Sequence, residues 1–371
     1  METRVLKASK IGPAAAAREG AKALRAGKLV AFATETVYGV GALATNAAAL
    51  ERLRELKSRP ARPFSVHMGQ AADAGRYVGR IPSETRRLMG KGWPGPVTIL
   101  LPTGGALADG RLQKAGLHEV LTSDGVIALR CPDESVARAL LSAVKGPVVA
   151  SSANPARQRS PRDAEEVLDK LNGQIDMLID SGPTRYGRDS TIVRFDGEEL
   201  TIVRKGVYSQ RILRSLIRRT ILFVCTGNTC RSPMAAGLAK RILAERLGCS
   251  AGELRGRGIE VQSAGLFAGG GARPTPEAIA AAKARGADIA RHRSRKLTAE
   301  LIRRADVVFC MTDLHVDEAR RLVPSAARRI RRLDEGGDIT DPIGGGARVY
   351  DRTAGRMDKV LGPILDDVLN D

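Results

Sequence analysis

The residues with the clearest chemical potential form a short loop that has a cysteine near one end and an arginine near the other. The loop reads Cys-Thr-Gly-Asn-Thr-Cys-Arg-Ser-Pro and runs from Cys225 to Pro233. A thiolate is a strong nucleophile, and a guanidinium can bind two phosphoryl oxygens side by side. Cys225 and Arg231 therefore predict attack of sulfur on a bound phosphate ester. Ser232 is expected to hydrogen-bond the thiolate and to help it leave the phosphocysteine intermediate.

The segments on either side of this loop are those that such chemistry requires. The apolar residues 221–224 predict a buried strand before the loop, and the amphipathic residues 234–247 predict a helix that begins near Pro233. Backbone amides of a loop at a helix N-terminus can converge on an anion, which the helix dipole also favours. We expect the same field to lower the pKa of the Cys225 thiol.

With these neighbours, the second half of the chain resembles the low-molecular-weight protein phosphatase family across essentially its full length. Further matches are Ser263-Ala-Gly, His292-Arg-Ser-Arg, residues 305–312 and the late pair Asp341-Pro. The resemblance implies a four-stranded parallel sheet. It also makes Asp341 the general acid, which protonates the leaving group and then activates the hydrolytic water.

Two positions bear on the substrate of this half. Thr229 stands where tyrosine-directed members carry Ile, and the loop as a whole resembles the bacterial branch that acts on phosphoarginine. That branch usually has an aromatic residue after the Asp-Pro pair, where this chain has Ile343. We predict a phosphoprotein substrate with phosphoarginine preferred, Thr229 as the specificity residue, and phosphotyrosine as the alternative. Arsenate reductases share the fold, but they need two further cysteines seven apart, which Cys249 and Cys310 do not match.

The first half spreads its polar residues over several clusters instead of one loop. Before Arg219 there is no Gly-x-x-x-x-Gly-Lys-Ser/Thr loop, and no Gly-x-Gly-x-x-Gly loop follows a strand, so we expect neither a P-loop nor a Rossmann site. The clusters fall at the ends of predicted strands, where open α/β sheets bind ligands. They lie at residues 34–39, 57–60, 130–132, 151–154, 188–191 and 204–206, with His67 and Ser160 between them.

Together these clusters resemble the YrdC-type threonylcarbamoyl-AMP synthase family over about residues 10–217. The resemblance rests on the order and spacing of TxTVYG, KxRP, a strand histidine, WPGPVT, SxN and GRxST. The residues that match the nucleotide motif of the family are Lys57, Arg59, Ser152 and Asn154. The resemblance also assigns residues to two sides of the site: Ser160 and Arg204 to the ATP side, and Thr36, His67, Arg130 and Ser190 to the threonine and bicarbonate side.

The chemistry that this resemblance implies has two stages. Threonine captures bicarbonate as a carbamate, which then attacks the α-phosphorus of the substrate ATP and gives threonylcarbamoyl-AMP and pyrophosphate. That product is the activated intermediate for threonylcarbamoylation of a tRNA adenosine, and a separate transferase would complete the modification. Lys57, Arg59 and a Mg²⁺ ion are expected to offset the negative charge. No carboxylate cage is evident, so the ion would be held mainly by phosphates and water.

The elements that must position these residues alternate along the chain, which predicts an α/β fold for both halves. We predict strands at residues 29–34, 64–68, 97–101, 126–130, 147–150, 177–180, 191–195, 201–204, 221–225, 259–263 and 307–311. We predict helices at residues 14–26, 47–57, 135–144, 164–171, 209–217, 233–247, 276–285 and 360–369. The boundary is placed near Arg218, with a twisted α/β sheet domain at residues 10–218 and the phosphatase domain at residues 219–371.

The composition excludes several other classes of protein. The 371 residues are 43% hydrophobic and 27% charged, as in globular proteins, and no apolar run approaches the 18 residues of a membrane span. No signal peptide or disulfide framework is evident, so we expect a cytoplasmic location and no membrane partner.

The 60 basic and 41 acidic residues give a net charge of +19. This excess favours contact with phosphates or tRNA. The alternative for the first half is therefore a module that mainly binds RNA.

Overall fold

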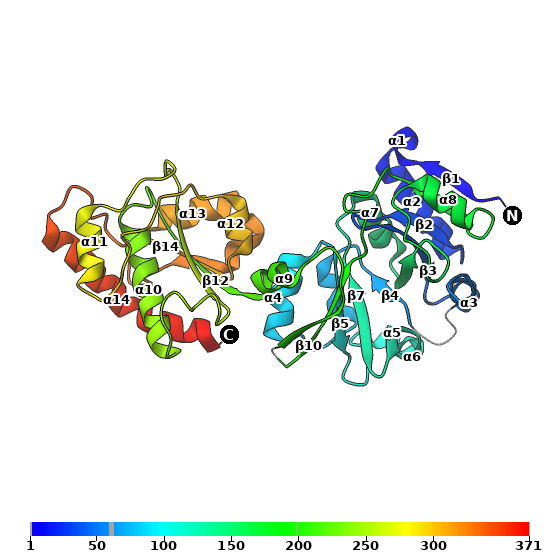
Figure 1. Ribbon diagram of the computed structural model, residues 1–371, viewed down its shortest axis with the longest axis horizontal. Coiled ribbons are helices and arrows are strands. Elements are labelled where there is room, and N and C mark those ends of the chain that lie inside the picture. The colour runs from blue at the N-terminus through cyan, green and yellow to red at the C-terminus, as the bar shows by residue number, and fades with distance from the viewer. Residues whose placement is uncertain (1, 59–62, 198, 371) are drawn as a thin grey trace. The chain divides into compact units, whose positions relative to one another are not determined.

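A computed structural model describes residues 2–58, 63–197 and 199–370 (Figure 1). The chain divides into two compact units, Met1–Ser215 and Leu216–Asp371, which we describe separately. Within the described residues, no helix is long and apolar enough to cross a membrane.

The first unit is built on a mixed sheet, which has 11 strands within the described residues. Their order is β1-β9-β2-β3-β8-β4-β7-β5-β10-β11, and β6 pairs with β7 at the side. The strands are β1 (Arg4–Lys7), β2 (Val30–Ala33), β3 (Tyr38–Leu43), β4 (Ser65–His67), β5 (Val97–Pro102), β6 (Thr122–Ser123), β7 (Val126–Arg130), β8 (Val148–Ser152), β9 (Met177–Asp180), β10 (Thr191–Asp196) and β11 (Glu199–Arg204).

Helices cover part of this sheet and bury apolar side chains against it. The helices and 3₁₀ turns are α1 (Ala8–Ile11), α2 (Pro13–Arg25), α3 (Ala47–Leu56), η1 (Ala71–Arg76), α4 (Ser83–Gly92), α5 (Gly110–Lys114), α6 (Leu117–Leu121), α7 (Ser135–Val144) and α8 (Ala164–Leu171). The boundary between the two units falls within a further helix, α9 (Gln210–Ile217). Residues of α2 and α7, such as Leu24 and Leu140, share one buried cluster with Phe32 of β2 and Ile179 of β9. This cluster packs α2 and α7 against β9 and β2, near the edge of the sheet formed by β1, and β3 follows as the next neighbour of β2.

The second unit has a parallel sheet of four strands within the described residues, in the order β13-β12-β14-β15. The strands are β12 (Arg219–Cys225), β13 (Ile259–Gly265), β14 (Val307–Cys310) and β15 (Ile330–Arg332). The helices are α10 (Arg231–Arg246), α11 (Pro276–Lys283), α12 (Ala299–Arg304), α13 (Asp313–Leu322) and α14 (Ala347–Asn370), with the 3₁₀ turn η2 (Pro324–Arg329).

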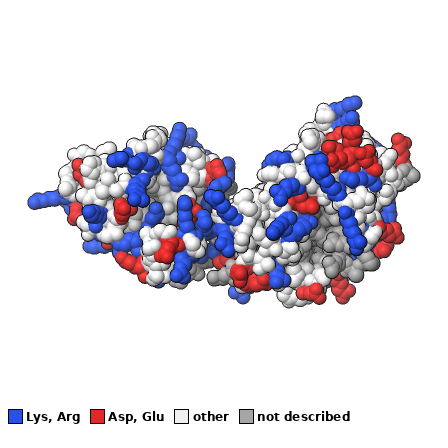
Figure 2. All heavy atoms as spheres, viewed as in Figure 1, with Lys and Arg blue, Asp and Glu red and all other residues white. Residues whose placement is uncertain are grey.

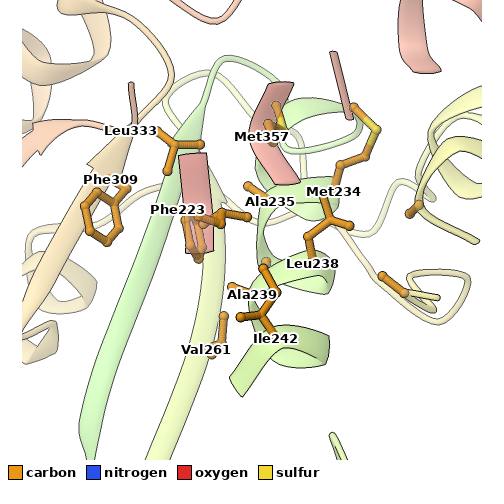
Figure 3. Close-up of a cluster of buried hydrophobic side chains, with 14 of the residues drawn as sticks. Phe223, Met234, Ala235, Leu238, Ala239, Ile242, Val261, Phe309, Leu333 and Met357 are labelled. Atoms are coloured by element: carbon orange, nitrogen blue, oxygen red, sulfur yellow. The ribbon is translucent and has the colours of Figure 1, made fainter. Parts of the chain in front are cut away.

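Successive residues of β12 point to opposite faces of this sheet. Ile221 and Phe223 join the cluster formed with α10, α11 and α14, and Phe223 stacks on Phe309 with ring centroids 5.7 Å apart (Figure 3). Leu222 and Val224 join the cluster on the other face, which includes residues of α12 and α13. The sheet is therefore buried on both sides, and its carboxyl edge is left to carry the loop that begins at Cys225.

The α/β fold class is confirmed, as is the parallel four-stranded sheet of the second unit. The strands predicted at 126–130 and 177–180 and the helices at 135–144 and 164–171 coincide with β7, β9, α7 and α8. The pattern did not predict β1, β3, β6 or β15. In β3 every residue but the last is buried, so its sequence YGVGAL lacks the alternation of a half-exposed strand. The last helix was predicted too short: α14 begins at Ala347 and continues through Pro363.

Candidate active sites

A cavity of about 680 Å³ opens on one face of the sheet in the first unit. Its lining comes from strands far apart in sequence, including β3, β4, β7, β8 and β10. Five of the residues predicted for the nucleotide and threonine sites line it: His67, Arg130, Ser152, Ser190 and Arg204. A concave site of this size can enclose a nucleotide-sized ligand.

Arg130, at the end of β7, is held by the segment that joins β2 and β3. Its Nη2 donates to the side-chain oxygens of Thr34 at 3.3 Å, Glu35 at 3.2 Å and Thr36 at 2.5 Å. The Arg130 and Glu35 side chains are 6% and 0% exposed, so their ion pair is buried. The buried Nε of Arg130 has no hydrogen-bond partner among the residues described. This arrangement fixes the guanidinium through Nη2 and leaves its other N–H groups to donate to an anionic ligand.

Glu35 is a site residue that the sequence reasoning missed, although it lies inside the TxTVYG run. Its second oxygen accepts a hydrogen bond from the backbone N–H of Asp133 at 3.0 Å. A buried carboxylate with these two contacts balances the charge of Arg130 and fixes its direction. The signal that could have found it was a single acidic residue in the short connection between two apolar segments.

His67 ends β4 and lies beside Arg130 in the sheet, where the two residues are register partners. Its ring Nδ1 is 3.1 Å from the carbonyl oxygen of Ser65. Burial and the nearby charge of Arg130 lower the pKa of His67 to about 3. The imidazole is therefore neutral near pH 7, and it can accept or donate a hydrogen bond in the cavity without adding charge.

Lys57 follows α3 and binds the loop that leaves β8. Its Nζ donates to the carbonyl oxygens of Ser152 at 2.9 Å and Asn154 at 2.5 Å. Asn154 is buried, and its side-chain oxygen has no hydrogen-bond partner within the described part of the chain. Lys57, Ser152 and Asn154 are thus brought together as the sequence motif predicts. Arg59, the remaining member of the motif, lies outside the described residues.

The last polar group of this unit surrounds Ser190, just before β10. Arg204 donates to the Ser190 carbonyl oxygen at 2.8 Å and to its Oγ at 3.0 Å, and Thr98 Oγ1 lies 2.9 Å from the same Oγ. Ser160 donates to the carboxylate of Asp189 at 2.9 Å. Ser160 and Arg204, predicted for the ATP side, are therefore linked to neighbouring residues of one loop, 189 and 190.

In the second unit, Cys225 ends β12 and the loop turns directly into α10. Ser232 Oγ lies 2.9 Å from the Cys225 sulfur, and the backbone N–H of Asn228 donates to that sulfur at 3.3 Å. Asn228 has a positive φ of 56° and is fully buried. Its side-chain amide donates to Ser232 Oγ at 2.8 Å and to Ser263 Oγ at 2.9 Å, which holds the loop in a tight ring. The backbone amides of such a ring can converge on one anion.

The pKa of the Cys225 thiol differs from the prediction. Burial raises it, and the hydrogen bonds from Ser232 and Asn228 and the charge of Arg231 only partly oppose that rise. The structure thus does not bear out a lowered pKa, because the effect of burial on the sulfur outweighs these opposing contributions. Arg231 donates to Ile339 O at 3.1 Å, to Thr226 Oγ1 at 3.1 Å, and to the carboxylate of Asp341.

Asp341 and Arg231 form an ion pair at the mouth of this loop. The Arg231 side chain is 4% exposed and that of Asp341 is 38% exposed. The structure therefore brings together all four residues predicted for phosphatase catalysis: Cys225, Arg231, Ser232 and Asp341. An acid at this position can face a leaving group while the arginine faces the phosphoryl oxygens.

The rim of the loop carries the residues that bear on the substrate. Thr229 is half-buried, and Ile343 is 66% exposed. The backbone N–H of Phe267 bonds to the carbonyl of Thr226 at 3.0 Å, and Phe267 is 71% exposed. The family resemblance predicts an aromatic residue at position 343, and the sequence pattern does not predict a role for Phe267. Phe267 follows β13, and its backbone contacts the same loop.

Two family models match this chain. The model described as "Telomere recombination", for the Sua5, YciO and YrdC proteins, matches residues 22–206. The model described as "Low molecular weight phosphotyrosine protein phosphatase" matches residues 220–371.

Individual relatives match one half each. A threonylcarbamoyl-AMP synthase of Bacillus subtilis is 34% identical over 200 residues, which are 54% of this chain and 56% of that protein. One of Halorhodospira halophila is 34% identical over 171 residues, 46% of this chain and 83% of that protein. A protein-arginine-phosphatase of B. subtilis is 36% identical over 160 residues, 41% of this chain and 97% of that protein.

The chain spans only about half the length of the first two synthases that it matches. Among solved structures, P. abyssi Sua5 complexed with L-threonine covers 98% of this chain with 22% identity and a TM-score of 0.50, which is a likeness of fold alone. The chain belongs in its first unit to the Sua5/YciO/YrdC family, and in its second unit to the low-molecular-weight protein phosphatase family.

Proposed function

We propose that the chain is a bifunctional enzyme, and that its first unit makes threonylcarbamoyl-AMP from threonine, bicarbonate and ATP. The observation that supports this most is the convergence of Arg130, His67, Ser152, Ser190 and Arg204 on one cavity. The fixed guanidinium of Arg130 offers N–H groups to a carboxylate or carbonate, and neutral His67 and the Ser190 hydroxyl can bind threonine. Thr36 does not line the cavity: it is fully buried, and its hydroxyl holds Arg130 in place. The named function of the synthase relatives points to the same reaction.

Lys57 would act here chiefly by shaping the nucleotide side of the site. By binding two carbonyl oxygens of the loop after β8, its ammonium holds Ser152 and Asn154 in place. It also brings positive charge to the place where a triphosphate would lie, and Arg59 is proposed to add to it.

A Mg²⁺ ion on the ATP phosphates fits this site. Within the described residues there is no group of three His, Cys, Asp or Glu side chains that could hold a metal ion. Mg²⁺ bound through substrate phosphates and water needs only one or two carboxylates, and Asp189 lines the cavity. The ion would neutralise phosphate charge when bound.

The experiment for the first unit is mass spectrometry of the products formed from ATP, threonine and bicarbonate. We expect threonylcarbamoyl-AMP and pyrophosphate only when all three substrates are present. If tRNA bound tightly but ATP was not consumed under any of these conditions, the RNA-binding module would replace the synthase as the function of this unit. Lys and Arg side chains are spread over the face seen in Figure 2, with Asp and Glu among them, so that face offers RNA no purely basic surface.

We propose that the second unit hydrolyses phosphoprotein through a phosphocysteine intermediate. The observation that supports this is the Arg231–Asp341 ion pair at the mouth of the loop that carries Cys225 and Ser232. When a phosphoryl group takes the place of Asp341 on Arg231, the carboxyl group is released toward the leaving group. The thiol would ionise when substrate binds, since the Asn228 N–H already donates to the sulfur and Ser232 Oγ lies 2.9 Å from it.

Phosphoarginine is the proposed substrate, with phosphotyrosine as the alternative. Thr229 supports it, because a hydroxyl at the rim suits a polar guanidinium leaving group, and the arginine-phosphatase relative supports it as well. The exposed ring of Phe267 could stack on a planar group of either kind. The experiment is a panel of phosphoarginine, phosphotyrosine and phosphoserine peptides assayed for phosphate release. Release from phosphotyrosine alone would overturn the arginine assignment and leave the phosphatase standing.

The role of Asp341 as the acid has its own test. We expect Asp341→Ala to slow hydrolysis of a substrate with a poor leaving group more than of one with a good leaving group, because a good leaving group needs little protonation. Equal slowing of both would count against this role. The downstream tRNA-modifying transferase and the cytoplasmic location stay predictions from the sequence.

A further inference from the structure

Thr226, the residue directly after the nucleophile, lies between two buried groups. Its hydroxyl accepts a hydrogen bond from Nη2 of Arg231 at 3.1 Å. The same oxygen is 3.0 Å from Nε2 of His315, at the start of α13. A threonine hydroxyl can accept from one neighbour while it bonds a second, so the three side chains form one continuous network.

His315 is fixed on its other side as well. Its Nδ1 is 2.5 Å from the Oγ1 of Thr312, the residue that caps α13. The ring is 2% exposed, and burial together with the charge of Arg231 lowers the pKa of His315 to about 4. The imidazole is therefore uncharged near pH 7 and can stay in contact beside the guanidinium without repulsion.

The network matters because Asp341 cannot serve as a permanent partner of Arg231. In the proposed reaction its carboxyl group must turn to the leaving group, and a phosphoryl group must take its place on the guanidinium. Nη1 of Arg231 then still donates to the carbonyl oxygen of Ile339. Of the contacts described above, Nη2 retains only its hydrogen bond to the Thr226 hydroxyl. Two acceptors on the two terminal nitrogens are enough to define the plane of the guanidinium.

We propose that Thr226 and His315 are positioning residues that hold Arg231 in the orientation for phosphate when Asp341 leaves it. His315 acts through Thr226 and touches neither the sulfur nor the phosphate. This inference rests on the proposed phosphatase function. It adds a dependence on a hydroxyl at position 226 and on an uncharged hydrogen-bonding side chain at position 315.

The experiment uses the full chain and two pairs of variants. Thr226→Val removes the hydroxyl at nearly constant volume, and Thr226→Ser keeps it. His315→Leu removes both ring contacts, and His315→Gln keeps an amide that can reach Thr226. We measure kcat and KM for the preferred substrate and, by calorimetry, the binding of inorganic phosphate. Thr298→Val, which removes the cap of α12, controls for the loss of a threonine hydroxyl remote from the loop.

We expect Thr226→Val and His315→Leu each to weaken phosphate binding and lower kcat/KM by roughly tenfold or more, because each leaves a charged hydrogen bond unsupported. The two conservative variants and Thr298→Val should stay within about threefold. In the Thr226→Val background, His315→Leu should add little, because both act through one contact. If His315→Leu does not fold, His315→Gln with and without Thr226→Val supplies the same comparison.

Additive losses in the double variant, or unchanged phosphate binding in Thr226→Val, would overturn the inference. A purely structural role would lower the melting temperature and leave phosphate affinity and kcat unchanged in the folded protein. If the wild-type chain hydrolysed no phosphorylated substrate, the proposed phosphatase would fail, yet phosphate calorimetry would still test whether Thr226 and His315 position Arg231.

Discussion

The two units hold their functional arginines in different ways. Arg130 in the first unit is tied to a fully buried carboxylate, Glu35, and to two threonine hydroxyls of the same segment. Arg231 in the second unit is paired with a carboxylate that is 38% exposed. A buried ion pair is costly to break, whereas a half-exposed one exchanges partners readily. The first arginine is therefore a fixed part of its cavity, and the second can pass from Asp341 to a phosphoryl group.

The units also differ in how their sites are assembled. The loop from Cys225 to Ser232 joins one strand to one helix, so a single turn sets the distances between sulfur, amides and guanidinium. The cavity of the first unit draws on several strands and their connections, and its geometry depends on the register of the sheet. We infer that backbone changes remote from the sites should alter the geometry of the cavity more readily than the geometry of the loop.

The largest expected effect is the separation of the two activities by Cys225→Ser. Serine is a far weaker nucleophile in this loop, so phosphatase activity should fall by roughly 10⁴-fold or more. Pyrophosphate release should be unchanged, because the cavity of the first unit contains none of the loop residues. Both rates are measured on the same preparation. A parallel fall in pyrophosphate release would show that the two sites are not independent.

Next in size is Lys57→Ala. Loss of the ammonium frees the loop at Ser152 and Asn154 and removes positive charge, and we expect pyrophosphate release to fall by about 10²–10³-fold. Lys10→Ala, at an exposed position of α1, is the matched control. Turnover that stays at the wild-type level in Lys57→Ala would contradict the assigned nucleotide side.

Gly206→Ala tests the dependence of the first site on backbone packing. A Cβ at Gly206 would lie 2.4 Å from backbone atoms of Asp189, Ser190 and Thr191, so the loop that presents Ser190 would have to shift. A displacement of about 1 Å in a site can cost roughly 10²-fold in rate, and we expect that loss in pyrophosphate release with the phosphatase intact. Gly75→Ala, where a Cβ meets nothing within 4 Å, should change neither activity.

The smallest expected effect is a change of preference in the second site. Thr229→Ile replaces a hydroxyl with apolar bulk at the rim, and we expect the ratio of kcat/KM for phosphoarginine over phosphotyrosine to fall by about tenfold. The ratio is measured on matched peptides. A wild-type ratio below one that does not fall on substitution would leave tyrosine as the substrate.

Much of the second site could be predicted from sequence because its parts are close together in the chain. A strand, an eight-residue loop and a helix define where Cys225, Arg231 and Ser232 lie. The pattern did not predict the pairing of Arg231 with Asp341 and Ile339, since those contacts depend on how the segment after β15 packs beside the loop. It also did not predict the contact of Thr226 with His315, which depends on the packing of α13. The raised pKa of Cys225 has the same origin, because burial is a property of the folded unit.

In the first unit the sequence determined the identity and order of the polar clusters, the alternation of strands and helices, and most of the strand positions. It did not give β3, whose residues are almost all buried and therefore lack alternation, or the pairing of Glu35 with Arg130. Only the tertiary structure decided which strands lie side by side and which clusters share one cavity. The physical reason is that residues 67, 130, 152, 190 and 204 approach one another through long-range strand pairing and packing, and local side-chain patterns carry little information on either.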